Sequence, residues 1–144
     1  MSGYDISANA VEIARKISSR FRLDMSFGEL DLTAQDLSVP GATLLTCYAL
    51  EQLKYHTEEV LTRMLSWKPA QVIHMEPVAE FYNPLKPRDL LGIGYVRWKD
   101  YQDNLYTTLR RLEGRGWVKI LNACRLGLAG NGLNEISFIR WRPA

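Results

Sequence analysis

Cysteine and histidine are scarce in this chain of 144 residues, which contains two of each. The cysteines, Cys47 and Cys124, lie within apolar segments and form no CxxC motif or Cys/His cluster at metal-ligand spacing. The pattern therefore argues against a metal centre and predicts two reduced, buried thiols. A nucleophilic Cys47 is the alternative, although the sequence places no activating base near it.

Long apolar runs and a strong excess of one charge are absent as well. No run approaches the roughly 20 residues that cross a bilayer, and no basic-then-apolar signal opens the chain, so we expect a cytoplasmic protein without a membrane partner. A formal net charge of +2 indicates no nucleic-acid partner. A hydrophobic content of 47% suffices for a core, and we expect residues 1–144 to form a single domain.

A glycine-rich phosphate loop between a strand and a following helix is also missing. Gly92-Ile93-Gly94 and Gly127-x-x-Gly130-x-Gly132 lack that context, so we interpret both as turns. The first short strand, Tyr4-Asp5-Ile6, instead ends in an acid close to the N-terminus. The few residues before Asp5 leave no room for the loop that precedes a ribose-binding acid by about 20 residues in dinucleotide-type folds.

Hydrophobic periodicity predicts three helices. Ser7 is a suitable N-cap for a helix over residues 8–20, and further helices are predicted over 50–66 and 100–113. The proline-containing segment 78–99 is expected to be a loop with room for one short helix. The apolar face of the first helix is assigned to Ala10, Ile13, Ala14, Ile17 and Phe21.

The strand-like runs indicate an α/β fold. The run from Ala42 to Tyr48 is apolar and β-branched, which is typical of a strand buried on both faces of a parallel sheet. Strand, helix and strand with short connections predict a parallel crossover. Asn131-Gly132 between the last two runs predicts an antiparallel C-terminal hairpin. The strands are expected within residues 24–32, 42–48, 71–77, 117–128 and 135–141.

The first third of the chain resembles a known family. Tyr4-Asp5-Ile6-Ser7, the helix with Ala10 to Arg15, and Gly28-Glu29-Leu30-Asp31-Leu32-Thr33 are similar to the second and third motifs of class I S-adenosylmethionine-dependent methyltransferases. The resemblance implies a Rossmann-like methyltransferase sheet, mostly parallel and truncated at its N-terminus. The first strand and its glycine-rich cofactor loop would be missing, between the strands that carry Asp5 and Tyr48.

The resemblance also implies a binding site for S-adenosylmethionine at the C-terminal ends of the strands. Asp5 would accept hydrogen bonds from the ribose hydroxyls, Asp31 would lie beside the adenine, and the segment after Cys47 would flank the methionine and the transferring methyl group. Taken singly, Asp5 and Asp31 fit turn or cap acids equally well, and Tyr48 fits a core residue. The implied cofactor-binding residues are Asp5, Ile6, Asp31, Leu32, Cys47, Tyr48 and Leu50.

Three functions remain open at this point. The chain is a methyltransferase domain that another chain completes, a degenerate module that pairs its strands with a partner or a second copy, or an independent α/β fold without a cofactor. No pattern identifies a methyl acceptor or a catalytic residue. Two charge-assisted hydrogen bonds contribute roughly 1.5–3 kcal/mol each, against a roughly 4–15 kcal/mol cost of association, so we expect weak cofactor binding at best.

Overall fold

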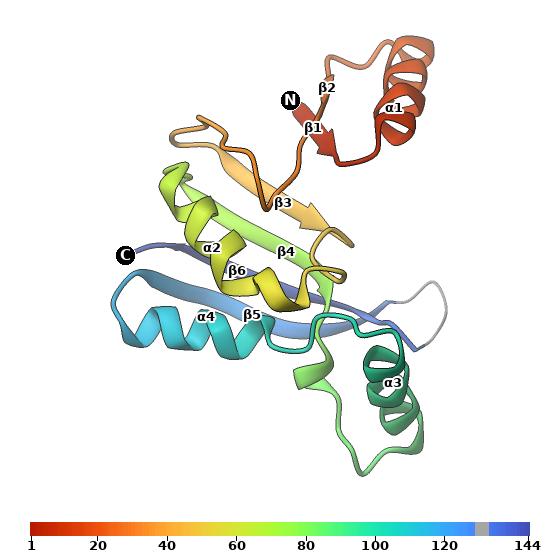
Figure 1. The fold of residues 1–144 in the computed structure, drawn as a ribbon, viewed down its shortest axis with the longest axis vertical. Helices are drawn as coiled ribbons and strands as arrows, with labels where there is room; N and C mark the ends of the chain where they lie inside the picture. Colours follow the sequence, from red (N-terminus) through yellow and green to blue (C-terminus); the bar gives the residue numbers. More distant parts are fainter. Residues whose placement is uncertain (129–132) are drawn as a thin grey trace. The chain divides into compact units, whose positions relative to one another are not determined.

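The structure is a computed structural model that describes residues 1–128 and 133–144. These residues divide into two compact units, Met1–Leu37 and Ser38–Ala144 (Figure 1). The first unit contains a two-stranded sheet and the second a four-stranded sheet. The sequence predicts that a strand is missing between the strand of Asp5 and the strand before Tyr48. In agreement, no described strand pairs with both sheets.

The first unit is a strand–helix–strand motif in which the two strands run parallel. The helix begins after Ser7, whose Oγ accepts a hydrogen bond from the Ala10 N–H at 3.4 Å. It ends at Arg22, which adopts the left-handed conformation with φ 52°. The predicted helix over 8–20 is therefore confirmed. The elements are β1 (Ser2–Asp5), α1 (Ala8–Phe21) and β2 (Ser26–Glu29).

The apolar face predicted for α1 is wrong in its direction. Ile13, Ile17 and Phe21 are 58%, 48% and 65% exposed, whereas the buried side chains are Val11 and Ser18. Two strands of four residues each offer a narrow surface, which the side of α1 around Val11 covers. Because apolar residues of α1 occupy two neighbouring stripes, periodicity did not decide which stripe faces the strands.

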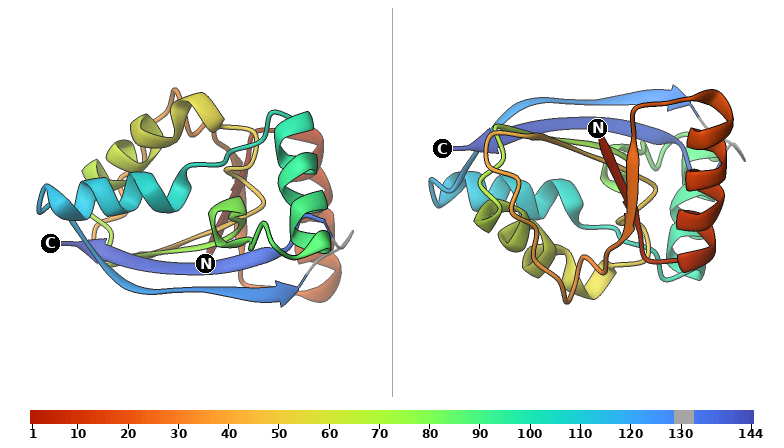
Figure 2. Two further views of the ribbon diagram at one scale, coloured as in Figure 1. Left: turned by 90° about the horizontal axis from the view of Figure 1, so that it is seen from below. Right: turned by 90° about the horizontal axis from the view of Figure 1, so that it is seen from above.

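The second unit is a four-stranded sheet with the order β3-β4-β6-β5. β3 and β4 are parallel, and β6 is antiparallel to both β4 and β5. α2 and α4 lie on the same side of this sheet (Figure 2, left). The strands are β3 (Thr43–Cys47), β4 (Gln71–Pro77), β5 (Val118–Leu128) and β6 (Ile136–Pro143). The helices are α2 (Thr57–Ser66), α3 (Pro87–Trp98) and α4 (Leu105–Gly114), with short 3₁₀ turns η1 (Lys54–His56) and η2 (Ala79–Phe81).

The predicted antiparallel pairing of the last two strands is confirmed by the β5–β6 register. The Asn131-Gly132 turn, and Gly130 with it, lie outside the described residues. Gly127 has a φ of +69°, as expected for a glycine in a turn-like conformation, but Gly92 and Gly94 lie in α3 rather than in a turn.

The core of the second unit lies between the sheet and the helices α2 and α4. Its central side chains are at most 1% exposed, and burying each contributes about 1.5–3 kcal/mol. None of the described helices is long and apolar enough to cross a bilayer. The core side chains are Val60, Leu61, Met64, Val72, Leu105, Leu109, Leu112, Ile139 and Trp141.

Two predictions about burial on this sheet are wrong. β3 is an edge strand rather than a strand covered on both faces, and its Leu45 is 61% exposed. Cys47 and Cys124 are exposed thiols rather than buried ones. Alternate side chains of a strand point to opposite faces, and these side chains point away from the covered face.

The structure also corrects the start of the second predicted helix. α2 begins at Thr57 rather than at residue 50. The preceding chain forms turns rather than an α-helix, because the Leu50 carbonyl accepts the Leu53 N–H at 2.9 Å and the Glu51 carbonyl accepts the Gln102 N–H at 2.7 Å.

The segment 78–99, predicted as a loop with room for one short helix, contains α3, a helix of 12 residues. Pro87 stands at its first position, where a missing N–H breaks no helical hydrogen bond. α4 begins at Leu105 rather than at residue 100, and Glu80 accepts the N–H groups of Tyr106 and Thr107 in its first turn.

Candidate functional site

Asp5 ends β1, at the edge where open parallel sheets bind ligands. Its Oδ1 accepts a hydrogen bond from the Ser7 N–H at 2.7 Å, so the carboxylate also shapes the turn into α1. The side chain is exposed, and its Oδ2 makes no hydrogen bond to any residue that the structure describes. Asp5 is therefore a turn acid that still offers one oxygen to a ligand.

A cavity of about 300 Å³ opens beside the ends of β1 and β2. This volume is at the lower end of the range for small-molecule sites. Aliphatic side chains and two carboxylates share the wall, a combination that suits a flat ring with polar edges. The lining residues are Ile6, Glu29, Leu30, Asp31, Ala34 and Gln35.

Asp31 is fixed in the cavity wall by its own turn. Its Oδ1 accepts hydrogen bonds from the Thr33 N–H at 2.8 Å and the Thr33 hydroxyl at 2.6 Å. Its backbone N–H donates to the Gln35 side-chain oxygen at 2.8 Å. Of the predicted residues in this unit, Ile6 and Asp31 line the cavity, whereas Asp5 precedes Ile6 and Leu32 lies half-buried in the turn.

The second group of predicted residues follows β3. Tyr48 has a φ of 51°, which is uncommon for a bulky side chain. Its N–H donates to the Met75 carbonyl at 3.3 Å, and its hydroxyl donates to the Asn134 carbonyl at 3.1 Å. Leu50 is 3% exposed, so it packs in the core, while Cys47 is exposed. These bonds hold the chain in a tight turn at the end of the strand.

Glu76 positions this turn and was missed in the sequence. Its carboxylate is buried and accepts the Ala49 N–H at 3.0 Å and the Leu50 N–H at 3.2 Å. Desolvation raises the pKa of Glu76, while hydrogen bonds from Thr46 and from the two N–H groups oppose that effect. A signal was available, because Glu76 ends a predicted strand in the same way as Asp5.

His74, two residues before Glu76 on β4, is fully buried. Its Nε2 accepts the indole N–H of Trp141 at 2.8 Å, so Nδ1 carries the proton and donates to the Thr46 hydroxyl at 2.9 Å. Burial lowers the pKa of His74 to about 3, which keeps the imidazole neutral at pH 7. Among the described residues, no group of three or more His, Cys, Asp or Glu side chains could hold a metal ion.

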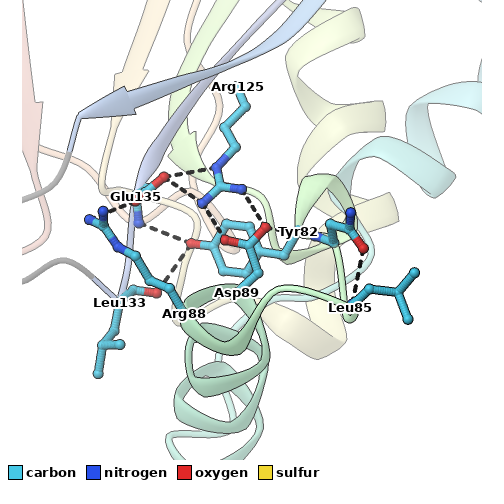
Figure 3. Close-up of polar contacts among 8 residues, drawn as sticks. Tyr82, Leu85, Arg88, Asp89, Arg125, Leu133 and Glu135 are labelled. Atoms are coloured by element: carbon cyan, nitrogen blue, oxygen red, sulfur yellow. Dashed lines mark hydrogen bonds and ion pairs between the residues drawn. The ribbon is translucent and has the colours of Figure 1, made fainter.

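An ion-pair network ties α3 to the β5–β6 pair (Figure 3). Arg125 donates to the two carboxylate oxygens of Asp89 at 2.6 and 2.7 Å and to Glu135 at 2.6 Å. Arg88 also pairs with Glu135 at 2.9 Å, and the Arg125 guanidinium lies 4.8 Å from the ring centroid of Tyr82. The bonds from Arg125 hold the pKa of Asp89 at about 2. This helix is therefore anchored by charge as well as by packing.

No protein-family model matches this sequence, and no curated protein is similar to it in sequence. Solved structures do match its fold. A magnesium protoporphyrin IX methyltransferase from Synechocystis PCC 6803 with bound SAH has a TM-score of 0.71 and 13% identity, covering 99% of this chain and 64% of that chain. The N-methyltransferase NodS from Bradyrhizobium japonicum WM9 has a TM-score of 0.68 and 10% identity, covering 99% of this chain and 65% of that chain. An O-methyltransferase from neocarzinostatin biosynthesis has a TM-score of 0.70 and 12% identity, covering 99% of this chain and 42% of that chain.

These likenesses establish the fold. The chain has the Rossmann-like α/β fold of class I S-adenosylmethionine-dependent methyltransferases, as the residues around Asp5 and Asp31 predicted. It spans about two thirds or less of the length of these three solved proteins.

Proposed function

We propose that residues 1–144 are one partial domain of an S-adenosylmethionine-dependent methyltransferase, which binds the adenosine part of the cofactor and needs another polypeptide segment for methyl transfer. The observation that carries this proposal is the cavity at the ends of β1 and β2, lined by Ile6 and Asp31. In open α/β sheets, ligands bind outside the carboxyl ends of the strands, which is where this cavity lies.

Each predicted residue has a distinct role in this proposal. The exposed carboxylate of Asp5 accepts hydrogen bonds from the ribose hydroxyls. Asp31 and the backbone of Leu32 contact the polar edge of the adenine, and Ile6 covers a ring face. In the second unit, the turn after β3, from Cys47 through Tyr48 to Leu50, is the segment that the resemblance assigns to the methionine part of the cofactor. The cofactor itself carries the reactive sulfonium, so the protein acts mainly by positioning.

The isolated chain should bind the cofactor weakly and show no turnover. Two charge-assisted hydrogen bonds contribute roughly 1.5–3 kcal/mol each. Association costs roughly 4–15 kcal/mol, which these contacts offset only in part. We therefore expect a dissociation constant of about 1 mM or weaker.

Titration of S-adenosylmethionine into the purified chain, followed by NMR, tests this site. We expect small shifts confined to residues 5–6 and 29–35 and their loss in Asp5→Ala and Asp31→Ala. Asp31→Asn keeps an acceptor for Thr33 and so separates loss of charge from loss of the turn. Asp24→Ala, an exposed acid outside the cavity lining, is the matched control and should bind like the unchanged protein. Tight binding, or binding that neither Asp5→Ala nor Asp31→Ala weakens, would contradict the assignment of the cofactor site to these residues.

A second candidate function is an assembly module without catalysis. The unpaired edge of β3 and the exposed Leu45 favour it, since such edges pair with other chains. Partner binding that is indifferent to the cofactor would support this alternative. We propose the cytoplasm as the compartment in either case, because a reducing environment preserves the exposed thiols of Cys47 and Cys124.

A further inference from the structure

The two faces of the four-stranded sheet differ sharply in burial. On the face that α2 and α4 cover, Val72, Ile139 and Trp141 are fully buried. On the opposite face Leu45 is 61% exposed, and both thiols are exposed as well. The strand register aligns six side chains there, which we name the open face: Leu45, Cys47, Ile73, Met75, Cys124 and Phe138.

Three exposed cations of β5 and β6 lie on the same side of the sheet as the open face. Arg140 and Arg142 follow Phe138 at alternate positions of β6, and Lys119 is opposite Arg142 on β5. None of the three forms an ion pair with a residue that the structure describes. The only acidic residue within the four strands is Glu76, which is buried on the covered face. This side of the sheet is therefore apolar along β3 and β4 and positive along β6 and β5, where Arg140 lies directly opposite Ile73, with no negative charge to balance it.

The outer edge of β3 adjoins the open face. β3 is the last strand in the sheet order, so the main-chain groups along its outer edge have no strand partner among the described residues. Such an edge is a template for strand addition. Strands parallel to one another are joined by crossover connections, usually helices, that pack on a face of the sheet. A strand added beside β3 can thus be continuous with a helix on the open face.

We infer that the β3 edge and the open face form one docking surface for a different polypeptide, whose apolar strand pairs with β3 and whose amphipathic helix covers the open face with acidic residues beside Lys119, Arg140 and Arg142. This inference rests on the proposed function in one respect, because it locates where the completing segment binds. The positive charge along β6 and β5 selects an acidic helix over a basic one.

A second copy of this chain fits the surface poorly. Two open faces packed together in register would bring the same three cations, Lys119, Arg140 and Arg142, against each other. α1 has an exposed apolar stripe, but it carries three basic residues and one acidic residue. Like charges across an interface oppose association, so the occupant is a different and acidic segment.

The natural thiols report directly on this surface. Cys47 and Cys124 are the only cysteines of the chain, and both lie on the open face. The probe is a synthetic polypeptide with an apolar strand of about five residues, a glycine-containing connection and a Leu/Ala helix of about 14 residues with Glu at its polar positions. A matched probe has Lys at those positions. At about ten times its dissociation constant, the Glu probe should slow alkylation of both thiols by N-ethylmaleimide about tenfold.

Charge reversal tests the electrostatic part of the inference. The triple variant Lys119→Glu, Arg140→Glu, Arg142→Glu should prefer the Lys probe over the Glu probe. Leu45→Lys should weaken the binding of both probes. Leu85→Lys, at an 89% exposed position outside the four strands, should leave the binding of both probes unchanged. Circular dichroism of each variant shows whether the fold is retained, and the exposed positions chosen leave the core intact.

Equal protection by the Glu and Lys probes, or protection by neither, overturns the inference. So does a dimer of the chain alone, seen by sedimentation, in which both thiols are already protected and from which Leu45→Lys releases monomers. Thiol protection without any cofactor binding leaves the docking surface standing and removes the methyltransferase proposal. Cofactor binding without thiol protection removes the docking surface and leaves the methyltransferase proposal standing.

Discussion

The carboxylate of Glu76 accepts the backbone N–H of Ala49 at 3.0 Å, so the end of β4 fixes the turn that follows β3. The same carboxylate accepts the N–H of Leu50 at 3.2 Å. The turn proposed to flank the methionine of the cofactor is therefore held by a buried acid on the neighbouring strand rather than by its own sequence.

Replacing Glu76 with Ala should lower the free energy of unfolding. The Leu50 N–H would be left buried without an acceptor, which costs about 1–3 kcal/mol. Urea unfolding followed by tryptophan fluorescence measures this loss. Glu59→Ala on α2 removes an exposed ion-paired carboxylate and should leave stability almost unchanged. Equal losses in the two variants would show that Glu76 does not hold the turn.

His74 should make stability depend on pH. Its pKa is about 3 in the folded protein, below the ordinary value of 6.5 that it regains on unfolding. The neutral imidazole therefore contributes stability that is complete above pH 6.5 and is lost as the pH falls toward 3, by up to about 1.4 kcal/mol per pH unit. His74→Gln keeps an acceptor for Trp141 but cannot titrate, so this slope should disappear.

Comparing the unchanged protein with His74→Gln separates the titration of His74 from that of Glu76. Burial raises the pKa of Glu76, so the contribution of that group has the opposite sign and is lost as the pH rises through its folded pKa. Because both proteins retain Glu76, its effect cancels in the difference. Urea unfolding between pH 7.5 and pH 4 gives the two curves. A difference that stays flat below pH 6.5 would refute the neutral, buried state of His74.

The Asp89–Arg125 ion pair predicts a second pH effect. Hydrogen bonds from Arg125 hold the pKa of Asp89 at about 2, below its ordinary 3.8. This group therefore contributes stability that is present above pH 3.8 and lost as the pH falls through 2. Asp89→Asn should have a lower Tm than the unchanged protein at pH 7, and the two Tm values should converge near pH 2. Asp103→Asn, which removes a longer exposed pair with Lys54, should leave Tm almost unchanged.

Local signals in the sequence located most elements, whereas long-range contacts set their limits. Ser7 marked the start of α1 because an N-cap acts within one turn of helix. The start of α2 could not be found in this way, since the Glu51 carbonyl before it accepts the N–H of Gln102, a residue far along the chain. The face of α1 and the exposure of Cys47 were missed for a related reason, because periodicity does not say which face another element covers.

The candidate site was predictable where an acid ends a strand. Asp5 ends β1 and Asp31 follows the end of β2, and Asp31 lines the cavity. Glu76 also lies at the end of a strand, β4, but it was not singled out from the sequence. The length of α3 was underestimated because proline and glycine usually interrupt helices, although Pro87 fits the first turn of a helix and Gly92 is required by packing.

Two glycines of α3 provide the last prediction. A Cβ on Gly92 would lie 2.8 Å from the Tyr82 ring and 2.9 Å from the Leu133 carbonyl oxygen, whereas a Cβ on Gly94 meets nothing within 4 Å. Tyr82 cannot yield easily, because its hydroxyl accepts the Glu135 N–H at 2.9 Å. Gly92→Ala should therefore destabilise the protein by about 1–3 kcal/mol through overpacking.

Gly94→Ala is the matched control in the same helix. Alanine in a helix interior is favoured over glycine by roughly 0.5–1 kcal/mol, so this variant should be more stable than the unchanged protein. The helical preference is common to both substitutions, so the difference between the two unfolding free energies in urea measures the packing of α3 alone. If both substitutions stabilise the protein to the same extent, α3 does not approach Tyr82 and Leu133 as closely as described, and the Asp89–Arg125 pair would be its main anchor.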